Sequence, residues 1–144
     1  MKKLVLCLGM CAALLTSCSN DDDNGVNVSE SRLMKKWYPT AYVIDGETIP
    51  YPNLECGMDY IELMEDGVVH DVEVISCEPT DTDMEMYTWS LDGDDITLNY
   101  GAGEVYTAQV TKLTSTELHI KGSGDIDGDG TDETIIEKYS TSGM

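Results

Sequence analysis

The sequence predicts an all-β fold, an antiparallel meander of eight or nine strands that closes into a β-barrel. Apolar residues recur at every second position in short runs, and turn-forming residues rich in Gly and Asp separate these runs. No convincing helical period interrupts them. We expect closure because an open meander would leave two long strand edges unpaired. With 144 residues, the chain has the length of one domain with one core.

The expected strands follow one another from residue 37 onward. A strand around residues 37–44 and a short one near residues 47–51 come first. The alternating runs that follow them are residues 59–64, 68–75, 84–91, 95–100, 104–112, 117–121 and 134–139. The segments between these runs are short enough to join antiparallel neighbours.

One face of the expected strands carries large apolar side chains and should line the barrel interior. Its members are Ile61, Leu63, Val68, Val72, Val74, Tyr87, Trp89, Leu91, Ile96, Leu98, Tyr100, Leu118 and Ile120. An eight-stranded barrel is just wide enough to be filled by its own side chains or to hold one small ligand. The length of the chain does not decide between these two states.

The first residues have the layout of a lipoprotein signal peptide. Lys2 and Lys3 precede an apolar run, residues 4–15, that is shorter than the about 20 residues needed to span a bilayer. The junction Leu-Thr-Ser-Cys, residues 15–18, resembles a bacterial lipobox. This resemblance implies that residues 1–17 are removed and that Cys18 is acylated. Several lipid chains on Cys18 would then anchor the protein to a membrane.

Residues 18–31 form a polar, acidic segment that we interpret as a tether ahead of a barrel domain at residues 32–144. The acidic cluster directly after Cys18 is similar to an export signal that places lipoproteins on the outer face of the outer membrane in Gram-negative gut bacteria. A plain flexible tether is the alternative. We therefore predict a lipid-anchored outer-membrane protein, exposed at the cell surface, whose membrane partner is lipid contacted through Cys18.

The chain is strongly acidic, with 28 acidic and 8 basic residues and a formal net charge of −20. Such a charge repels nucleic acid phosphates and anionic lipid heads, and it concentrates cations near the protein surface. Nucleic acid is therefore excluded as a partner. We expect a monomer.

Cys56 and Cys77 are predicted to form a disulfide. The two cysteines of the signal peptide leave with it and Cys18 is acylated, so this pair remains in an oxidising compartment. A two-residue turn at residues 66–67 would place Cys56 opposite Cys77, and a three-residue turn would shift the register by one residue. The alternative, a reactive dithiol, lacks the Cys-x-x-Cys spacing.

Short motifs follow one another in a distinctive order through residues 32–122. They are LMKKW, a cysteine at position 56 followed by DYIELMEDGVV, Cys77, YTWSLDGDDITL and VYTAQVTKLTSTELHI. Together they resemble the lipocalin-like domains of lipoproteins from anaerobic gut Gram-negative bacteria. Lys35 departs from that pattern, where a glycine is usual, and the acidic stretch from Asp125 is an addition. The resemblance implies a calycin-type barrel whose mouth takes a small apolar molecule.

The stretch GDIDGDGTDE, residues 124–133, packs five carboxylates into ten residues and predicts a Ca²⁺ site. Oxygen ligands at this density suit a hard cation. An EF-hand is excluded because Ile136 stands where the closing glutamate is needed, and the pattern resembles instead the calcium hairpin loops of propeller repeats. The alternative is an empty, hydrated acidic turn. The expected ligands of a structural Ca²⁺ are Asp125, Asp127, Asp129, the carbonyl of Thr131, and Glu133.

No motif points to catalysis, and we predict that the protein is not an enzyme. The two histidines lack partners at zinc-ligand spacing, and no nucleophile elbow or phosphate loop occurs. The preferred function is a surface-anchored barrel that binds a small apolar ligand, with a Ca²⁺-stabilised hairpin. A protein- or glycan-interaction module with a solid barrel is the alternative. The aromatic residues that would form a ligand platform, or else part of the core, are Trp37, Tyr87, Trp89, Tyr100 and Tyr106.

Overall fold

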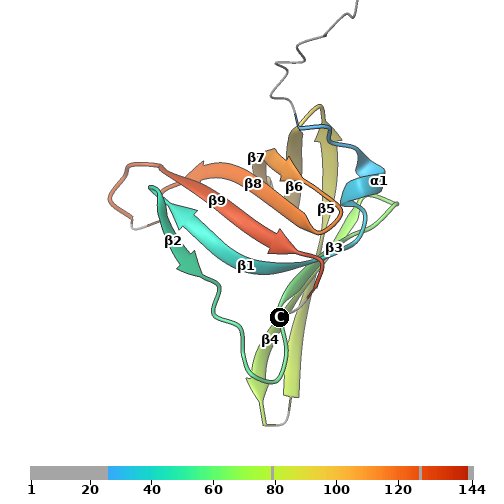
Figure 1. Cartoon of the computed structure of the whole chain (residues 1–144), viewed down its shortest axis with the longest axis vertical. Coiled ribbons are helices and arrows are strands. Elements are labelled where there is room, and N and C mark those ends of the chain that lie inside the picture. The colour runs from blue at the N-terminus through green and yellow to red at the C-terminus, as the bar shows by residue number, and fades with distance from the viewer. Residues whose placement is uncertain (1–25, 79, 127, 143–144) are drawn as a thin grey trace, which may run out of the picture.

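A computed structural model of the chain describes residues 26–78, 80–126 and 128–142 (Figure 1). The predicted signal peptide and Cys18 lie outside the described residues. In chain order the described elements are α1 (Glu30–Leu33), β1 (Lys36–Ile44), β2 (Glu47–Pro50), β3 (Tyr60–Leu63), β4 (Val68–Cys77), β5 (Thr80–Asp92), β6 (Asp95–Gly101), β7 (Glu104–Leu113), β8 (Glu117–Gly124) and β9 (Glu133–Ser140).

Eight of the strands form a closed antiparallel ring. From β3 to β9 each strand pairs with the next, β1 pairs with β3, and β9 returns to pair with residues 38–44 of β1. The ninth strand, β2, is an addition that pairs with residues 41–44 of β1. The turn between β1 and β2 holds Asp45 and Gly46 at φ of 50° and 86°, values that Gly and Asp tolerate. The predicted antiparallel meander that closes into a barrel is confirmed.

The N-terminal segment closes one end of the barrel, where β1 begins and β3 and β7 end. The Arg32 guanidinium donates a hydrogen bond to the carbonyl of Leu113, the last residue of β7, at 2.6 Å. The amide of Leu63, the last residue of β3, donates to the carbonyl of Lys35 at 3.3 Å. Leu33, at the end of α1, is 0% exposed. The short helix therefore plugs this end, although no helix was expected there.

The chain joins the barrel earlier than the predicted boundary at residue 32. Val26 and Val28 already pack against the core, within the segment that we interpreted as a tether. Of the described residues, no helical stretch is long and apolar enough to cross a membrane.

Two tryptophans fill the closed half of the barrel. Trp37 is 0% exposed, and its indole N–H donates to the carbonyl of Leu33 at 2.8 Å. The indole N–H of Trp89 donates to the carbonyl of Met64 at 3.1 Å. Both buried indoles thus have the partner that a polar N–H needs. The buried cluster around them contains Leu63, Val69, Ile96, Ala108, Val110, Leu113, Leu118 and Ile120.

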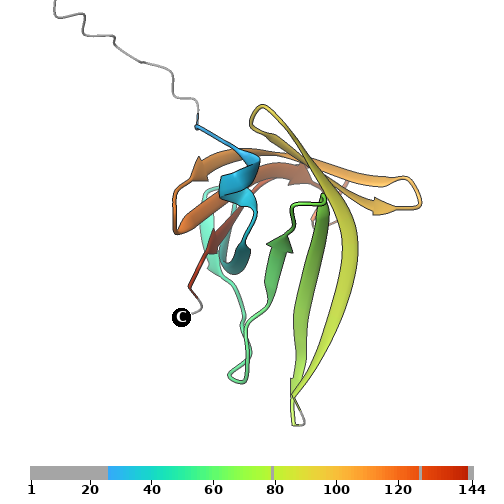
Figure 2. The same ribbon diagram turned by 90° about the vertical axis from the view of Figure 1, so that its right-hand side faces the viewer.

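The opposite end of the barrel is surrounded by loops. Because the strands alternate in direction, β1, β4, β6 and β8 end there, and β5, β7 and β9 begin there. The β4–β5 hairpin extends well past the other strands (Figure 2). The acidic stretch between β8 and β9 is one of the loops at this rim.

In β4 the odd-numbered residues 69 and 71 point into the barrel, whereas we expected the even-numbered residues 68, 72 and 74 to do so. Val69, not Val68, is fully buried, and it lies directly opposite Tyr87 of β5 and Leu63 of β3. Val72 and Val74 are buried as well, but on the other face of β4. There Gly57 covers Val74 so closely that a Cβ at position 57 would stand 3.0 Å from Cγ2 of Val74.

Candidate functional site

A cavity of about 190 Å³ lies inside the barrel, between the tryptophan-filled half and the open rim. Its wall combines apolar side chains with three carboxylates and seven of the eight tyrosines of the chain. The lining residues are Pro39, Tyr42, Tyr51, Asp59, Tyr60, Ile61, Leu63, Val69, Asp71, Tyr87, Ile96, Leu98, Tyr100, Tyr106, Ile120, Glu137 and Tyr139.

A β-bulge in β1 brings Tyr42 to the cavity. Near the start of β1, Trp37 and Pro39 face inward, so alternation alone would turn residues 41 and 43 inward next. The register with β9 shifts between Pro39 and Ala41, which leaves Thr40 as an extra residue. Beyond this bulge the even-numbered residues face inward, and Tyr42 lines the cavity.

Glu137 reaches the cavity from the middle of β9. It lies directly opposite Ile120 of β8 on one side and Tyr42 of β1 on the other, and all three residues line the cavity. The hydroxyl of Tyr139, two residues further along the same face, donates a hydrogen bond to Oε2 of Glu137. The neighbouring Lys138 alternates to the outer face. Glu137 is therefore a half-buried carboxylate that shares the barrel interior with tyrosines.

Asp71 brings a second carboxylate to the cavity from β4. It lies opposite Ile61 of β3, and its Oδ2 accepts a hydrogen bond of 3.0 Å from the hydroxyl of Tyr87. The rings of Tyr87 and Tyr100 are tilted by 46° to each other, with centroids 4.4 Å apart. The aromatic wall and the carboxylate are thus parts of one packed arrangement.

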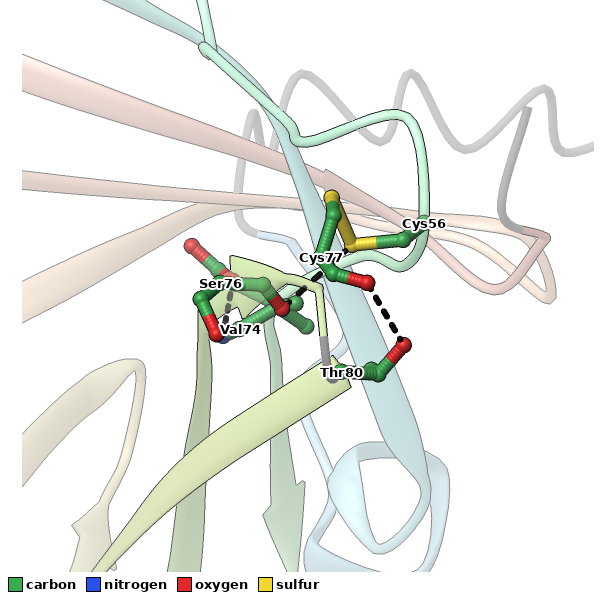
Figure 3. The surroundings of a disulfide bond; sticks show 6 residues. Cys56, Val74, Ser76, Cys77 and Thr80 are labelled. Atoms are coloured by element: carbon green, nitrogen blue, oxygen red, sulfur yellow. Dashed lines mark hydrogen bonds between the residues drawn. A yellow bond between two sulfur atoms is a disulfide. The ribbon is translucent and has the colours of Figure 1, made fainter.

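The loop before β3 supplies the third carboxylate, and the disulfide holds this loop in place. Cys56 and Cys77 are bonded, with Cα atoms 5.4 Å apart, which confirms the predicted pair (Figure 3). Further along the loop, Asp59 accepts a hydrogen bond of 2.8 Å from the amide of Val74 through Oδ1. Its Oδ2 accepts a hydrogen bond from the hydroxyl of Tyr51. Tyr51 and Asp59 therefore enter the cavity wall from a segment tied to β4.

Burial raises the pKa of several ionisable groups of the cavity. It raises the pKa of Glu137 above 4.5, and the charge of Asp71 raises it further, while the hydrogen bond from Tyr139 opposes the shift. Burial likewise raises the pKa of Asp71 above 3.8, against the hydrogen bond from Tyr87. It raises the pKa of Tyr106 to about 12, with a further contribution from Glu137. At neutral pH the phenol of Tyr106 is therefore protonated, and the charge of Asp71 disfavours the ionisation of Glu137.

Three of the five predicted ligand residues lie in the cavity wall, and two do not. Tyr87, Tyr100 and Tyr106 line it. Trp37 and Trp89 belong to the packed core of the closed half, with both indole N–H groups bound to backbone carbonyls. The structure thus separates the aromatic residues into a core set and a cavity set.

Several residues of the wall were not predicted from the sequence. Tyr42 depends on the bulge in β1, and Asp71 depends on the register of β4, neither of which alternation reveals. Glu137 and Tyr139 lie two residues apart in an expected strand. This spacing places both on the same face of the strand, and it is the sequence feature from which they could have been predicted. Tyr51 and Asp59 reach the wall from the segments flanking the disulfide loop.

The acidic stretch between β8 and β9 is folded around its own carboxylates. Oδ1 of Asp125 accepts a hydrogen bond of 2.7 Å from the amide of Gly128, and its Oδ2 accepts one of 3.0 Å from the amide of Gly130. Oε2 of Glu133 accepts a hydrogen bond of 2.9 Å from the amide of Ile126. The two ends of the predicted calcium loop are thus both engaged in closing it.

The other predicted calcium ligands are only partly described. Oδ1 of Asp129 accepts a hydrogen bond of 2.7 Å from the amide of Thr131. Asp127, the central residue of the pattern, lies outside the described residues. Among the residues that are described, no group of three or more His, Cys, Asp or Glu side chains is arranged to hold a metal ion. The five-ligand site therefore stays a prediction.

Comparisons with known proteins agree with this architecture. The model of the lipocalin-like domain family matches residues 33–120. The chain is similar in structure to a lipocalin-like protein from Bacteroides uniformis ATCC 8492, with a TM-score of 0.55, 12% identity, and coverage of 77% of this chain and 99% of that one. It is also similar to an uncharacterized protein from Bacteroides eggerthii DSM 20697, with a TM-score of 0.50, 12% identity, and coverage of 74% and 99%. No curated protein matches this sequence.

Proposed function

Since the chain belongs to the family of lipocalin-like domains, we propose that it binds a small organic molecule inside its barrel. The lipocalin fold is generally a binding fold and not a catalytic one. The observation that carries the proposal is the cavity of about 190 Å³, which has a tyrosine-rich wall and lies next to the open rim. Aromatic side chains offer large contact areas with little loss of conformational freedom, which suits a ligand site.

The cavity favours ligand binding over the alternative of an interaction module with a solid barrel. A solid barrel would leave no interior space at the open end. The volume is nevertheless small beside the about 300–1,000 Å³ of sites for drug-sized ligands. We therefore expect a ligand smaller than a typical drug.

A cavity-filling variant tests this proposal. Leu98 lines the cavity, so Leu98→Trp should fill much of it. Val105, which is 55% exposed on β7, offers the matched control Val105→Trp. The two variants and the unaltered protein are titrated with a panel of small organic molecules by calorimetry, and circular dichroism verifies folding. Binding that Leu98→Trp abolishes and Val105→Trp preserves supports the proposal, whereas binding that Leu98→Trp preserves contradicts it.

The proposal includes a structural Ca²⁺ ion between β8 and β9. What supports it is the density of oxygen ligands in residues 125–133 and the tight closure of the loop around Asp125 and Glu133. A bound cation would offset the repulsion among these carboxylates. Its place at a hairpin tip suits a structural role, in which it fixes the last two strands of the ring.

The proposal also places the protein at the outer membrane through a lipidated Cys18. The support is the signal-peptide layout of residues 1–17 and the lipobox-like junction. Metabolic labelling with a fatty acid, followed by membrane fractionation, tests it in a Gram-negative gut bacterium. The unaltered chain should carry label and sediment with the outer membrane, and Cys18→Ala should do neither. An unlabelled protein that stays in the cytosol with its leader would contradict this part.

A further inference from the structure

We propose that the ligand of this cavity is a small organic cation, an amine with an aromatic or apolar body, whose charge lies between Asp71 and Glu137. The inference rests on the proposed function, because it names the class of molecule that the same cavity takes. It goes beyond the expectation of an apolar ligand by assigning a charge to that ligand.

The cavity wall carries negative charge and no basic side chain. Asp59, Asp71 and Glu137 line it, and no Lys, Arg or His does, within the part of the chain that is described. The basic residues next to the inward-facing Ile120 and Glu137 turn to the outer face because side chains alternate along a strand. They are His119, Lys121 and Lys138. A carboxylate ligand such as a fatty acid would meet repulsion here and find no counter-ion.

Among the residues that the structure describes, no basic side chain forms an ion pair with Asp71 or Glu137. Each accepts a hydrogen bond from a neutral phenol instead. The hydroxyl of Tyr87 donates to one oxygen of Asp71, and the hydroxyl of Tyr139 donates to one oxygen of Glu137. Burial raises the pKa of both carboxyl groups, and the charge of Asp71 raises the pKa of Glu137 further. An ammonium group in the cavity would donate charge-assisted hydrogen bonds to the remaining oxygens and remove this repulsion.

The tyrosine rings complete a site suited to a cation. The faces of aromatic rings attract cations, more strongly where water is excluded. Tyr87 and Tyr100 form a packed pair beside Asp71, and the hydroxyl of Tyr87 points to that carboxylate. The apolar body of the ligand would contact the floor, which Leu63, Val69 and Ile96 of the core provide.

The charge of the whole protein acts in the same direction. The formal net charge is −20, and carboxylates crowd the open end, including Asp83 and Glu85 on the extended β4–β5 hairpin. Such a field raises the local concentration of cations and their rate of entry. The cavity and its surroundings therefore both favour a positively charged ligand.

Three probes with the same ring separate the possibilities: 2-phenylethylamine, 2-phenylethanol and phenylacetate. Each is titrated calorimetrically into the unaltered protein at pH 7 and low ionic strength. The amine should bind more tightly than the alcohol by roughly tenfold to a hundredfold, the range expected for hydrogen bonds to charged groups. Phenylacetate should not bind. Tighter binding of the alcohol or the acid would overturn the assignment of charge while leaving ligand binding in the cavity intact.

Two isosteric variants locate the charge recognition, and a third serves as control. Glu137→Gln and Asp71→Asn should each lower the affinity for the amine by roughly tenfold and leave the affinity for the alcohol nearly unchanged. Glu104→Gln, which removes an exposed carboxylate outside the cavity wall, should leave both unchanged. An equal loss of affinity for the amine in all three variants would overturn the inference, because it would show that the overall negative charge of the surface, and not the cavity, attracts the amine. If none of the probes binds and Leu98→Trp loses no binding to any molecule of the panel, both the inference and the proposed function fail.

Discussion

The side chain of Tyr106 on β7 lies directly over the backbone of Gly122 on β8. A Cβ at position 122 would stand 2.7 Å from Cζ of Tyr106, a separation that real side chains do not adopt. The absence of a side chain at Gly122 therefore lets Tyr106 take its place in the cavity wall. Gly122 lies in an extended strand, so space and not backbone conformation is the reason for a glycine here.

Replacing Gly122 with alanine should displace Tyr106 and change the cavity. The ring must turn away from β8, and we expect a destabilisation of roughly 1–3 kcal/mol, the range for overpacked sites, together with weaker ligand binding. Chemical denaturation and calorimetric titration measure the two effects. Gly124→Ala is the control, because its Cβ would meet only Cδ1 of Ile135 at 4.0 Å. Equal behaviour of the two variants would show that Tyr106 does not depend on Gly122.

Removing the disulfide should reduce both stability and ligand affinity. The bond joins residues 21 apart in the chain, and a closed loop of about this length contributes roughly 3 kcal/mol in the chain-entropy model. We expect the double variant Cys56→Ser with Cys77→Ser to lose stability of that order in denaturant titrations. Ligand affinity should also fall, because the bond fixes the segment that carries Asp59. An unchanged unfolding midpoint, with the oxidised state of the unaltered protein verified by mass, would contradict this role.

The stability of Glu137→Gln relative to the unaltered protein should depend on pH. Burial raises the pKa of Glu137 in the folded state above its usual 4.5, so the unaltered protein loses stability as the pH rises through the folded-state value. Below pH 4.5 this carboxyl is protonated in both states and carries no such penalty. The melting temperature of Glu137→Gln minus that of the unaltered protein should therefore increase between pH 4 and pH 7. A difference that stays constant or shrinks over this range would contradict the shift.

Calcium should stabilise the β8–β9 hairpin. Thermal unfolding is followed with excess chelator and with millimolar CaCl₂, since affinities of about 10⁻⁴–10⁻³ M are typical of extracellular sites. The melting temperature should rise with Ca²⁺ in the unaltered protein and not in Asp129→Asn. Asp45→Asn, which alters an exposed acid in the turn after β1, should respond like the unaltered protein. A rise of the same size in Asp129→Asn would point to general screening of the acidic surface.

The sequence was sufficient for the order of strands, because alternation and tight turns are local signals. It was also sufficient for the pair Cys56 and Cys77, since the expected signal peptide and acylation site account for the other three cysteines. Both follow from short-range rules that tertiary structure did not override. The short helix that plugs the closed end was missed, because four residues carry too little helical period to detect.

The sequence was a weaker guide to which side chains of a strand point into the barrel and which point outward. A two-residue turn between β3 and β4 would place Leu63 opposite His70, whereas the structure places it opposite Val69. Such a slip by one residue exchanges the two faces of a strand. It moves Val72 to the outer face and brings Asp71 into the cavity. The bulge at Thr40 has the same effect on β1, so the wall of the site depends on two features of register that composition does not encode.

The central claim is that a small molecule binds in the tyrosine-lined half of the barrel and not in the tryptophan-filled half. Two-dimensional NMR of the ¹⁵N-labelled protein tests it most directly, using whichever of the three phenyl probes binds most tightly. We predict saturable shifts in the backbone amides of Tyr42, Asp71 and Glu137, with the indole N–H signals of Trp37 and Trp89 nearly unmoved. Shifts centred on the two indoles, or scattered over the outer faces of the strands, would contradict the claim.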